Sequence, residues 1–292
     1  EQTQAIREAA TSGLLLITGG PGTGKTTILR GILELLGQNQ LRCLLAAPTG
    51  RAAKRLTEVT GEDASTIHRL LEAGIDPATG KMFFARDAEN PLKCDAVIVD
   101  EMSMVDVSLL YSLLQAIPTG KRLILVGDPD QLPPVGPGFP FGDMLRSGSL
   151  PTVRLTEIFR QAQKSLIVMN AHRVNQGEMP DLKCVSSDFF FMRRTSEEAV
   201  CALIRDLCAT RLPQKMGIPT DQIQVLSPTR KGAVGTVNLN RLLQAALNPQ
   251  SPDKKERSYG DYQFREGDRV MQIRNNYDIL WKKADGSAVG AG

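Results

Sequence analysis

The residues best suited to chemistry stand in a glycine-rich segment, GGPGTGKTT, at positions 19–27. The segment matches the pattern G-x-x-x-x-G-K-[ST], whose glycines let backbone N–H groups converge on phosphate oxygens. It follows an apolar run and opens a helix-period stretch, so the positive end of a helix would face the same phosphates. We therefore predict a nucleotide site in which Lys25 reaches the β- and γ-phosphates and the Thr26 hydroxyl holds Mg²⁺. The predicted cradle consists of Gly19, Gly20, Pro21, Gly22, Thr23, Gly24, Lys25, Thr26 and Thr27.

A second group of reactive side chains is the pair Asp100-Glu101, at the end of the apolar run in AVIVDEMS. Asp100 suits a direct or indirect partner of Mg²⁺, and Glu101 suits a base that orients the attacking water. Carboxylate pairs after a strand are also common on plain surfaces, just as a glycine-rich turn can be purely structural. The two features together favour a nucleotide hydrolase, and the glutamate argues against a switch GTPase.

These groups need a scaffold that brings distant segments together. Four short apolar runs in the first half read as buried strands, and helix-period stretches lie between them. This alternation predicts an α/β fold with a mostly parallel sheet covered by helices on both faces. The strands are expected at 14–19, 43–48, 95–100 and 122–127, and the helices at 26–36, 51–59, 66–72 and 107–116.

The segment LILVGDPDQLPPVGPG, at 123–138, delivers Asp128 and Gln131 on a proline-rich loop after a core strand. In P-loop ATPases that carry such a glutamate, one strand lies between the phosphate-loop strand and the Asp-Glu strand. The strand at 122–127 is the candidate for that place. We therefore predict that Gln131 senses the γ-phosphate, the alternative being a loop glutamine with no role.

After Pro151 the pattern loosens, and we expect a second α/β domain. Its helices are expected at 164–177, 196–212 and 236–247, and its strands at 188–194 and 223–228. These strands alone do not complete a sheet, so the chain is expected to end inside this domain. Within the first domain, turn signals at Asp76-Pro77 and Thr79-Gly80 predict a projecting hairpin over 74–92.

Seven segments occur in the order of the superfamily 1 helicase motifs: EQTQAI, GGPGTGKTT, APTGRAAKRL, STIHRLL, VIVDEMSMVD, GDPDQLPPVGPG and LTEIFRQA. The chain most closely resembles the RecD-like, 5′→3′ DNA helicases. The resemblance implies a P-loop NTPase with a RecA-like ATP-binding domain at 1–155 and a second, incomplete RecA-like domain at 156–292. It also implies that Gln2 reads the adenine edge and that Arg160 reaches the γ-phosphate, the alternative for Arg160 being a solvated side chain.

The resemblance extends to positions that would contact single-stranded DNA through hydroxyls, backbone N–H groups and basic side chains. Without it, each of these stretches would read more simply as a helix cap, Ser65 and Thr66 above all. The hairpin at 74–92 corresponds to the family's pin that splits the duplex, in a short form. The implied DNA contacts are Pro48, Thr49, Gly50, Arg51, Ser65, Thr66, His68, Thr229 and Arg230.

The implied function is an ATP-driven helicase that translocates on single-stranded DNA and unwinds a duplex junction in repair or recombination. ATP and Mg²⁺ are the expected cofactors, nuclease or recombination subunits the expected partners, and the cytoplasm the expected location. A nucleotide-dependent switch and a passive nucleic-acid-binding module with a vestigial site are the competing hypotheses. The family's final motifs, with a C-terminal arginine, are absent, so a chain ending here is expected to bind Mg-ATP with little DNA-stimulated hydrolysis.

The composition of the chain limits its possible classes of fold and partner but does not identify its function. The 292 residues, 41% of them hydrophobic, suffice for two ordinary domains. A net charge of +3 permits a nucleic-acid partner without requiring one. The five scattered cysteines include no CxxC pair, which argues against a disulfide framework or a zinc site. No apolar run approaches the roughly 20 residues that a membrane span needs, so no membrane partner is expected.

Overall fold

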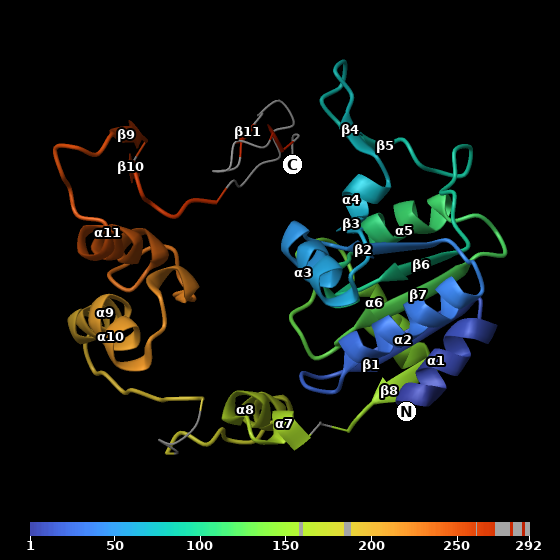
Figure 1. Ribbon diagram of the computed structural model, residues 1–292, viewed down its shortest axis with the longest axis horizontal. Coiled ribbons are helices and arrows are strands. Elements are labelled where there is room, and N and C mark those ends of the chain that lie inside the picture. The colour runs from blue at the N-terminus through green and yellow to red at the C-terminus, as the bar shows by residue number, and fades with distance from the viewer. Residues whose placement is uncertain (158–159, 184–187, 261, 272–280, 283–287, 290–292) are drawn as a thin grey trace. The chain divides into compact units, whose positions relative to one another are not determined.

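The computed structural model describes residues 1–157, 160–183, 188–260, 262–271, 281–282 and 288–289. The chain divides into two compact units, Glu1–Phe191 and Met192–Gly292. The first unit is built on a six-stranded sheet with the strand order β3-β2-β6-β7-β1-β8, and every neighbouring pair is parallel (Figure 1). Its strands are β1 (Leu14–Gly19), β2 (Cys43–Ala47), β3 (Ala64–Thr66), β6 (Ala96–Val99), β7 (Arg122–Gly127) and β8 (Thr152–Leu155).

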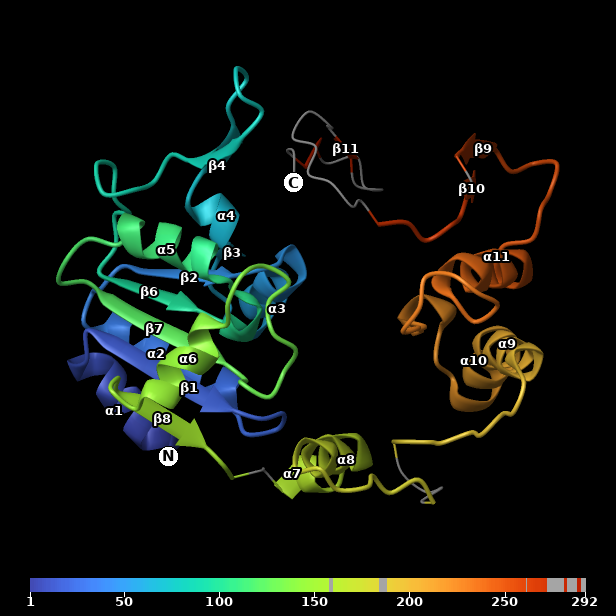
Figure 2. The ribbon, with the colours of Figure 1, turned by 180° about the vertical axis from the view of Figure 1, so that it is seen from behind.

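Helices cover both faces of this sheet because alternate strand residues point to opposite sides. On β1, Leu16 enters the core formed with α4, α5 and α6, whereas Leu15 and Ile17 enter the core formed with α1, α2 and α3. Figure 1 looks onto the face that carries α1 and α2, and Figure 2 onto the face that carries α6. The helices are α1 (Gln2–Thr11), α2 (Lys25–Gln38), α3 (Gly50–Thr60), α4 (Ile67–Leu70), α5 (Val107–Ala116) and α6 (Pro140–Ser147).

The predicted α/β fold with a parallel sheet covered on both faces is therefore confirmed. The bounds of β1, β7 and α5 coincide with those expected from the sequence, and β2 and β6 are each slightly shorter than expected. The helix expected over 66–72 is reduced to Ile67–Leu70. Its chain turns instead at Glu72, whose backbone has a φ of +53°, a conformation that a helix cannot continue.

The expected hairpin is present as β4 (Ala73–Ile75) paired antiparallel with β5 (Met82–Phe84). Its turn is fixed by Asp76, whose carboxylate accepts hydrogen bonds from the Ala78 N–H (2.9 Å) and the Thr79 hydroxyl (2.7 Å). These bonds lower the pKa of Asp76, the Thr79 hydroxyl bond most of all. The hairpin projects beyond the sheet (Figure 1) and exposes Ile75 and Met82.

Helices α7 (Arg160–Gln163) and α8 (Leu166–Asn175) also belong to the first unit, which runs on to Phe191. The second unit begins with α9 (Glu197–Asp206), a π-helical turn (Leu207–Arg211) and α10 (Leu212–Met216). It continues with α11 (Thr236–Leu247) and a hairpin of β9 (Glu256–Tyr259) and β10 (Tyr262–Arg265). A short pair, β11 (Trp281–Lys282) and β12 (Ala288–Val289), follows.

The expected helix at 236–247 is confirmed, but the strands expected at 188–194 and 223–228 are wrong, because neither segment has strand structure. Asp188 instead holds the start of α8, where its carboxylate accepts from the N–H groups of Leu166 (2.7 Å) and Ile167 (3.2 Å). Ser227 bends the second segment by donating its hydroxyl to the Val234 carbonyl at 2.8 Å. An apolar run becomes a strand only where a partner strand satisfies its backbone.

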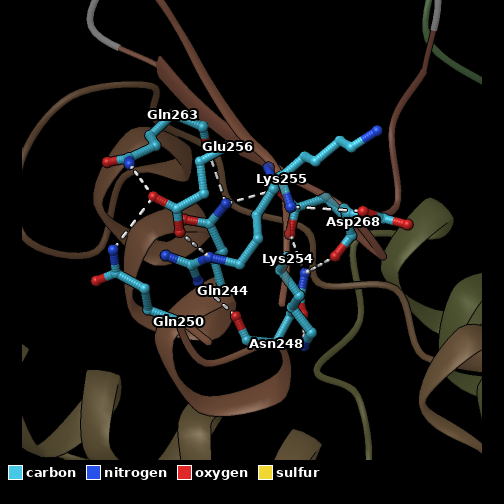
Figure 3. Close-up of polar contacts among 10 residues, drawn as sticks. Gln244, Asn248, Gln250, Lys254, Lys255, Glu256, Gln263 and Asp268 are labelled. Atoms are coloured by element: carbon cyan, nitrogen blue, oxygen red, sulfur yellow. Dashed lines mark hydrogen bonds and ion pairs between the residues drawn. The ribbon is translucent and has the colours of Figure 1, made fainter. Parts of the chain in front are cut away.

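A polar network fastens the β9–β10 hairpin to the end of α11 (Figure 3). Asp268 accepts hydrogen bonds from Gln244 (2.6 Å), Asn248 (2.7 Å) and the Arg265 N–H (2.7 Å). Burial opposes ionisation of this carboxyl, but these three bonds outweigh it and lower the pKa of Asp268. Arg265, almost fully buried, also forms an ion pair with Glu256 at 2.5 Å. Side-chain pairing thus stabilises a segment that has little apolar core.

None of the helices in the described ranges is long and apolar enough to cross a membrane.

The central strand β6 offers a direct test of the two-faced core, because Ile98 is fully buried on it. Ile98→Ala removes buried carbons and leaves a cavity, so we expect the free energy of unfolding of the first unit to fall by about 2–5 kcal/mol. Hydrogen exchange of the β6 and β7 amides measures this change, since central strands open with the whole unit. Tyr111→Ala, on the exposed side of α5, is the control and should change it by less than about 0.5 kcal/mol.

Candidate nucleotide-binding site

The loop between β1 and α2 has the geometry of a phosphate cradle. Gly22 and Gly24 adopt left-handed backbone conformations, with φ of +76° and +85°, which only glycine adopts freely. The buried Thr23 hydroxyl closes the loop by donating to the Gly20 carbonyl at 2.8 Å. Helix α2 then begins at Lys25, so its positive end lies at the loop.

Gly19 is required by close packing, because a β-carbon there would lie 2.9 Å from the Leu155 carbonyl oxygen and 2.6 Å from the Thr23 hydroxyl. The Lys25 ammonium donates to the carbonyl oxygens of Gly19 and Gly20, the latter at 3.1 Å, and so lies across the loop. Within the described part of the chain, the N–H groups of residues 22–26 have no hydrogen-bond acceptor. A row of free amides beside an ammonium group fits a polyphosphate chain.

Asp100 and Glu101 follow β6 directly. Asp100 is mostly buried, and its pKa is raised by that burial and by the neighbouring Glu101 carboxylate. Two effects oppose this rise. The Glu101 N–H donates a hydrogen bond to the Asp100 carboxylate at 2.9 Å, and both this bond and the positive charge of Lys25 lower the pKa of Asp100. The Asp100 carboxyl is therefore close enough to the Lys25 ammonium to be affected by its charge. A buried carboxylate beside phosphate oxygens is the ligand set that Mg²⁺ prefers.

The backbone of Glu101 is strained, with a φ of +56° and a ψ of +40°. A non-glycine residue in this region costs about 1–3 kcal/mol, and such residues concentrate at functional sites. The distortion ends β6 abruptly and directs the chain into a 3₁₀ turn at Met102–Met104. Glu101 is thereby presented at the end of the sheet instead of continuing the strand.

The loop after β7 carries Gln131, whose amide oxygen accepts a hydrogen bond from the Ser103 hydroxyl at 3.3 Å. Ser103 is fully buried, so this bond ties the loop to the turn that follows Glu101. Because the oxygen is engaged, the amide N–H₂ of Gln131 is the group left to donate to a ligand. The buried Asp128 shapes the start of the loop by accepting from the Asp130 N–H at 3.1 Å.

The same loop is fixed at its far end against α5. Asp106 caps that helix by accepting from the Leu109 N–H at 2.8 Å. The loop carbonyl of Pro137 accepts from the Val107 N–H at 3.0 Å. A β-carbon on Gly136 would overlap the Asp106 carboxylate, at 1.8 Å. The loop is therefore held by contacts with the Asp-Glu turn as well as by its prolines.

A cleft of about 540 Å³ runs beside these groups in the first unit. The phosphate loop contributes Gly20 and Pro21 to its wall, the loop after β7 contributes Asp128 and Gln131, and helix α8 contributes His172. Of the residues in this wall, Gly20, Pro21 and Gln131 were predicted from the sequence as site residues. Ser103 and His172 were not, and only their buried or cleft-lining positions in the fold identify them.

The other predicted residues have different surroundings. Gln2 is the first residue of α1 and is partly buried. Arg160 begins α7, and its side chain lies outside the described residues. His68 packs its ring against Phe84 of the hairpin, with centroids 5.8 Å apart.

The residues predicted to contact DNA divide between the two units. In the first unit, Thr49 and Thr66 are helix caps that accept from Ala52 (3.2 Å) and Arg69 (3.1 Å). The remaining first-unit positions, Pro48, Gly50, Arg51 and Ser65, lie beside them at the carboxyl ends of β2 and β3. Thr229 and Arg230 belong to the second unit, where Arg230 donates to the Tyr262 hydroxyl at 3.0 Å.

Together, the strand order and this site define a class of protein. A phosphate loop after β1, an acidic pair after β6 and a polar sensor loop after the intervening β7 characterise a P-loop NTPase with a RecA-like sheet. Sequence comparison agrees, because a family model described as an AAA domain matches residues 2–137. A second model, the SH3 domain of ATP-dependent RecD-like DNA helicases, matches residues 239–280.

Individual relatives narrow the class to a family. The ATP-dependent RecD2 DNA helicase of Deinococcus radiodurans is 38% identical over 95% of this chain. The RecBCD enzyme subunit RecD of Mycolicibacterium smegmatis is 42% identical over the whole chain. The chain belongs to the RecD-like helicase family. It spans 36% of the length of the first relative and 57% of the second.

Among solved structures, Bacteroides Pif1 bound to ssDNA is 23% identical and aligns over 70% of this chain and 55% of its own, with a TM-score of 0.43. The family assignment rests on the sequence matches.

The raised pKa of Asp100 predicts a conflict between stability and function. The folded protein binds this proton more tightly than the unfolded chain, so the associated stability is lost as pH rises through the folded pKa. Asp100→Asn removes the buried charge and keeps an oxygen for the Glu101 N–H, and should raise the melting temperature at neutral pH. The gain should vanish below the ordinary aspartate pKa of about 3.9. Thermal unfolding of the nucleotide-free protein measures it, and a gain that persists unchanged in acid contradicts this account.

Proposed function

We propose that this chain is the ATP-binding part of a DNA helicase, which couples ATP hydrolysis to translocation on single-stranded DNA and to unwinding. The observation that carries the proposal is that the phosphate loop with Lys25, the loop with Gln131 and the pair Asp100-Glu101 follow three neighbouring parallel strands, β1, β7 and β6. Each group has a hydrolytic role that needs the other two. The DNA-helicase part of the proposal is supported by the name of one relative, the ATP-dependent RecD2 DNA helicase.

In this mechanism the loop amides and Lys25 bind the β- and γ-phosphates, while Thr26 and Asp100 hold Mg²⁺. Bound Mg²⁺ would neutralise charge on the phosphates. Glu101 orients the attacking water and accepts its proton, and the Gln131 amide donates toward the γ-phosphate. Ser103 keeps that amide turned toward the cleft. Gln2 on the adenine edge and Arg160 on the γ-phosphate complete the proposed set.

The domain assignment is part of the proposal. Residues 1–155 are the proposed first RecA-like domain and 156–292 the proposed second, partial one. Of the latter, residues 156–191 belong to the first compact unit, and residues 239–280 match the SH3 model. The hairpin at 74–92 serves as the separation pin, and the exposed side chains of Ile75 and Met82, which flank its polar turn, support a role against stacked bases. Nuclease or recombination subunits are the proposed partners, and the cytoplasm is the proposed location. One relative is named as a subunit of a larger enzyme, RecBCD, which supports the proposal of partner subunits.

Glu101→Gln and Lys25→Ala should separate hydrolysis from binding. Glu101→Gln keeps the shape of the side chain but cannot take a proton, so turnover should fall by about 10²–10⁴-fold while ATP still binds. Lys25→Ala should lose binding and turnover together, because the charge on the phosphates is gone. Phosphate release and equilibrium binding of Mg-ATP are the measurements, with Glu62→Gln on the exposed surface as the control. Equal loss of binding in both variants would instead make Glu101 a metal ligand.

Arg51 tests the DNA path, because it is exposed at the start of α3. Arg51→Ala should weaken binding of an oligodeoxythymidine and reduce the slope of log affinity against log salt by about 0.7, the value for one phosphate contact on a single strand. Fluorescence anisotropy across a salt series measures both. Lys54→Ala, one turn further along α3 and largely exposed, should leave the slope unchanged. An unchanged slope in both variants removes Arg51 from the DNA path.

The competing function is a nucleotide-dependent switch that does not translocate. Stimulation of phosphate release by single-stranded DNA separates the two, since a motor on DNA must couple its two ligands. No response of either nucleotide binding or hydrolysis to DNA would favour the switch.

A further inference from the structure

His172 of helix α8 contacts the phosphate loop. Its ring nitrogen Nε2 lies 3.3 Å from the carbonyl oxygen of Pro21. A carbonyl oxygen can only accept, so the bond requires a hydrogen on Nε2. Pro21 has no N–H of its own, and its carbonyl is therefore the group through which this part of the loop can be held.

The sequence of the loop accommodates this ring. A β-carbon on Gly20 would lie 2.8 Å from His172 Cε1 and 3.6 Å from both ring nitrogens, and these are the three nearest atoms. Gly20 does not have a positive φ, unlike Gly22 and Gly24, so its backbone would accept alanine without strain. The absence of a side chain at position 20 is thus explained by the approach of His172 and not by a turn.

His172 stands on a helix that is itself firmly built. Ser165 caps α8 by accepting from the Val168 N–H at 3.2 Å. Asn170, buried on the same helix, donates to the Asp181 carbonyl (3.0 Å) and accepts from the Asp181 N–H (2.7 Å). Helix α7, which carries Arg160, packs against α8. A contact at His172 therefore joins this helix to the phosphate loop.

We propose that His172 latches α8 onto the phosphate loop at Gly20 and Pro21, making α8 the second wall of the nucleotide cleft. His172 is a positioning residue in this scheme. It holds the loop in its cradle shape before nucleotide binds and keeps the helix pair that carries Arg160 beside the γ-phosphate end. The role in nucleotide binding rests on the function proposed above, whereas the latch itself exists in the protein alone.

A double-mutant cycle between positions 20 and 172 tests the latch. In the wild-type background Gly20→Ala should displace the ring, speed hydrogen exchange of the amides at 22–26 and weaken binding of a fluorescent ATP analogue about tenfold. In the His172→Ala background the ring is gone, so Gly20→Ala should add less than a twofold further effect. Gly19→Ala is the matched control, because its obstacles are Leu155 and Thr23. Its effect should be the same in both backgrounds.

Two further variants separate the hydrogen bond from the shape of the ring. His172→Gln keeps a donor for the Pro21 carbonyl and should retain most of the nucleotide affinity. His172→Phe keeps a ring without a donor, and its affinity should fall about three- to tenfold, the value of one lost hydrogen bond. Because the latch positions phosphate-binding groups, the loss should appear in KM with a smaller change in kcat.

The outcomes separate the two proposals. If Gly20→Ala is equally harmful with and without the His172 ring, the latch is wrong, while nucleotide binding by the wild-type chain still stands. If the wild-type chain binds no nucleotide, the proposed function fails, and the exchange rates of the nucleotide-free variants still decide the latch. In that case, the latch is also wrong if the effects of Gly20→Ala and His172→Ala on hydrogen exchange simply add.

Discussion

The site depends on one topological constraint, the position of β7 between β1 and β6. Parallel strands deliver their carboxyl ends to the same edge, so the phosphate loop, the sensor loop and the acidic pair lie side by side in that order. Had β6 paired directly with β1, Gln131 would lie outside the line that joins Lys25 to Asp100. The register of the β1–β7 and β6–β7 pairs is fixed by apolar residues that fill two cores, since a slip of one residue would reverse both faces.

This arrangement costs stability where it creates function. The buried Asp100 carboxyl has a raised pKa, and Glu101 has a left-handed backbone. Neither the buried carboxyl nor the strained backbone stabilises the folded state. The surrounding sheet compensates through two continuous cores, and the bond between Ser103 and Gln131 ties the strained turn to the sensor loop. The acidic pair and the loop that carries Gln131 are thereby linked through Ser103.

Local patterns were enough to predict the four central strands of the first sheet, because each of them is a continuous apolar run. They missed the two edge strands, β3 and β8, which are short and contain polar residues. The position of β7 between β1 and β6 was also predicted, because Glu101 after Asp100 is typical of P-loop ATPases in which one strand lies between these two. The same reasoning failed at 188–194 and 223–228, where apolar runs have no partner strand and polar side chains hold the chain instead. It also missed contacts between distant residues. His172 and Pro21 are separated by 151 positions, and Ser103 and Gln131 by 28. No local pattern indicates that a lone histidine on an amphipathic helix meets a glycine of the phosphate loop.

The central claim is that three strand ends form one nucleotide site around a divalent cation. A crystal structure of the chain with a non-hydrolysable ATP analogue and Mn²⁺ in place of Mg²⁺ tests it most directly, because the anomalous signal locates the metal. We predict a single strong peak between the Thr26 hydroxyl and Asp100, with the γ-phosphate facing the Gln131 amide. A metal bound away from Asp100, or a nucleotide outside the cleft between the phosphate loop and Gln131, would contradict the account.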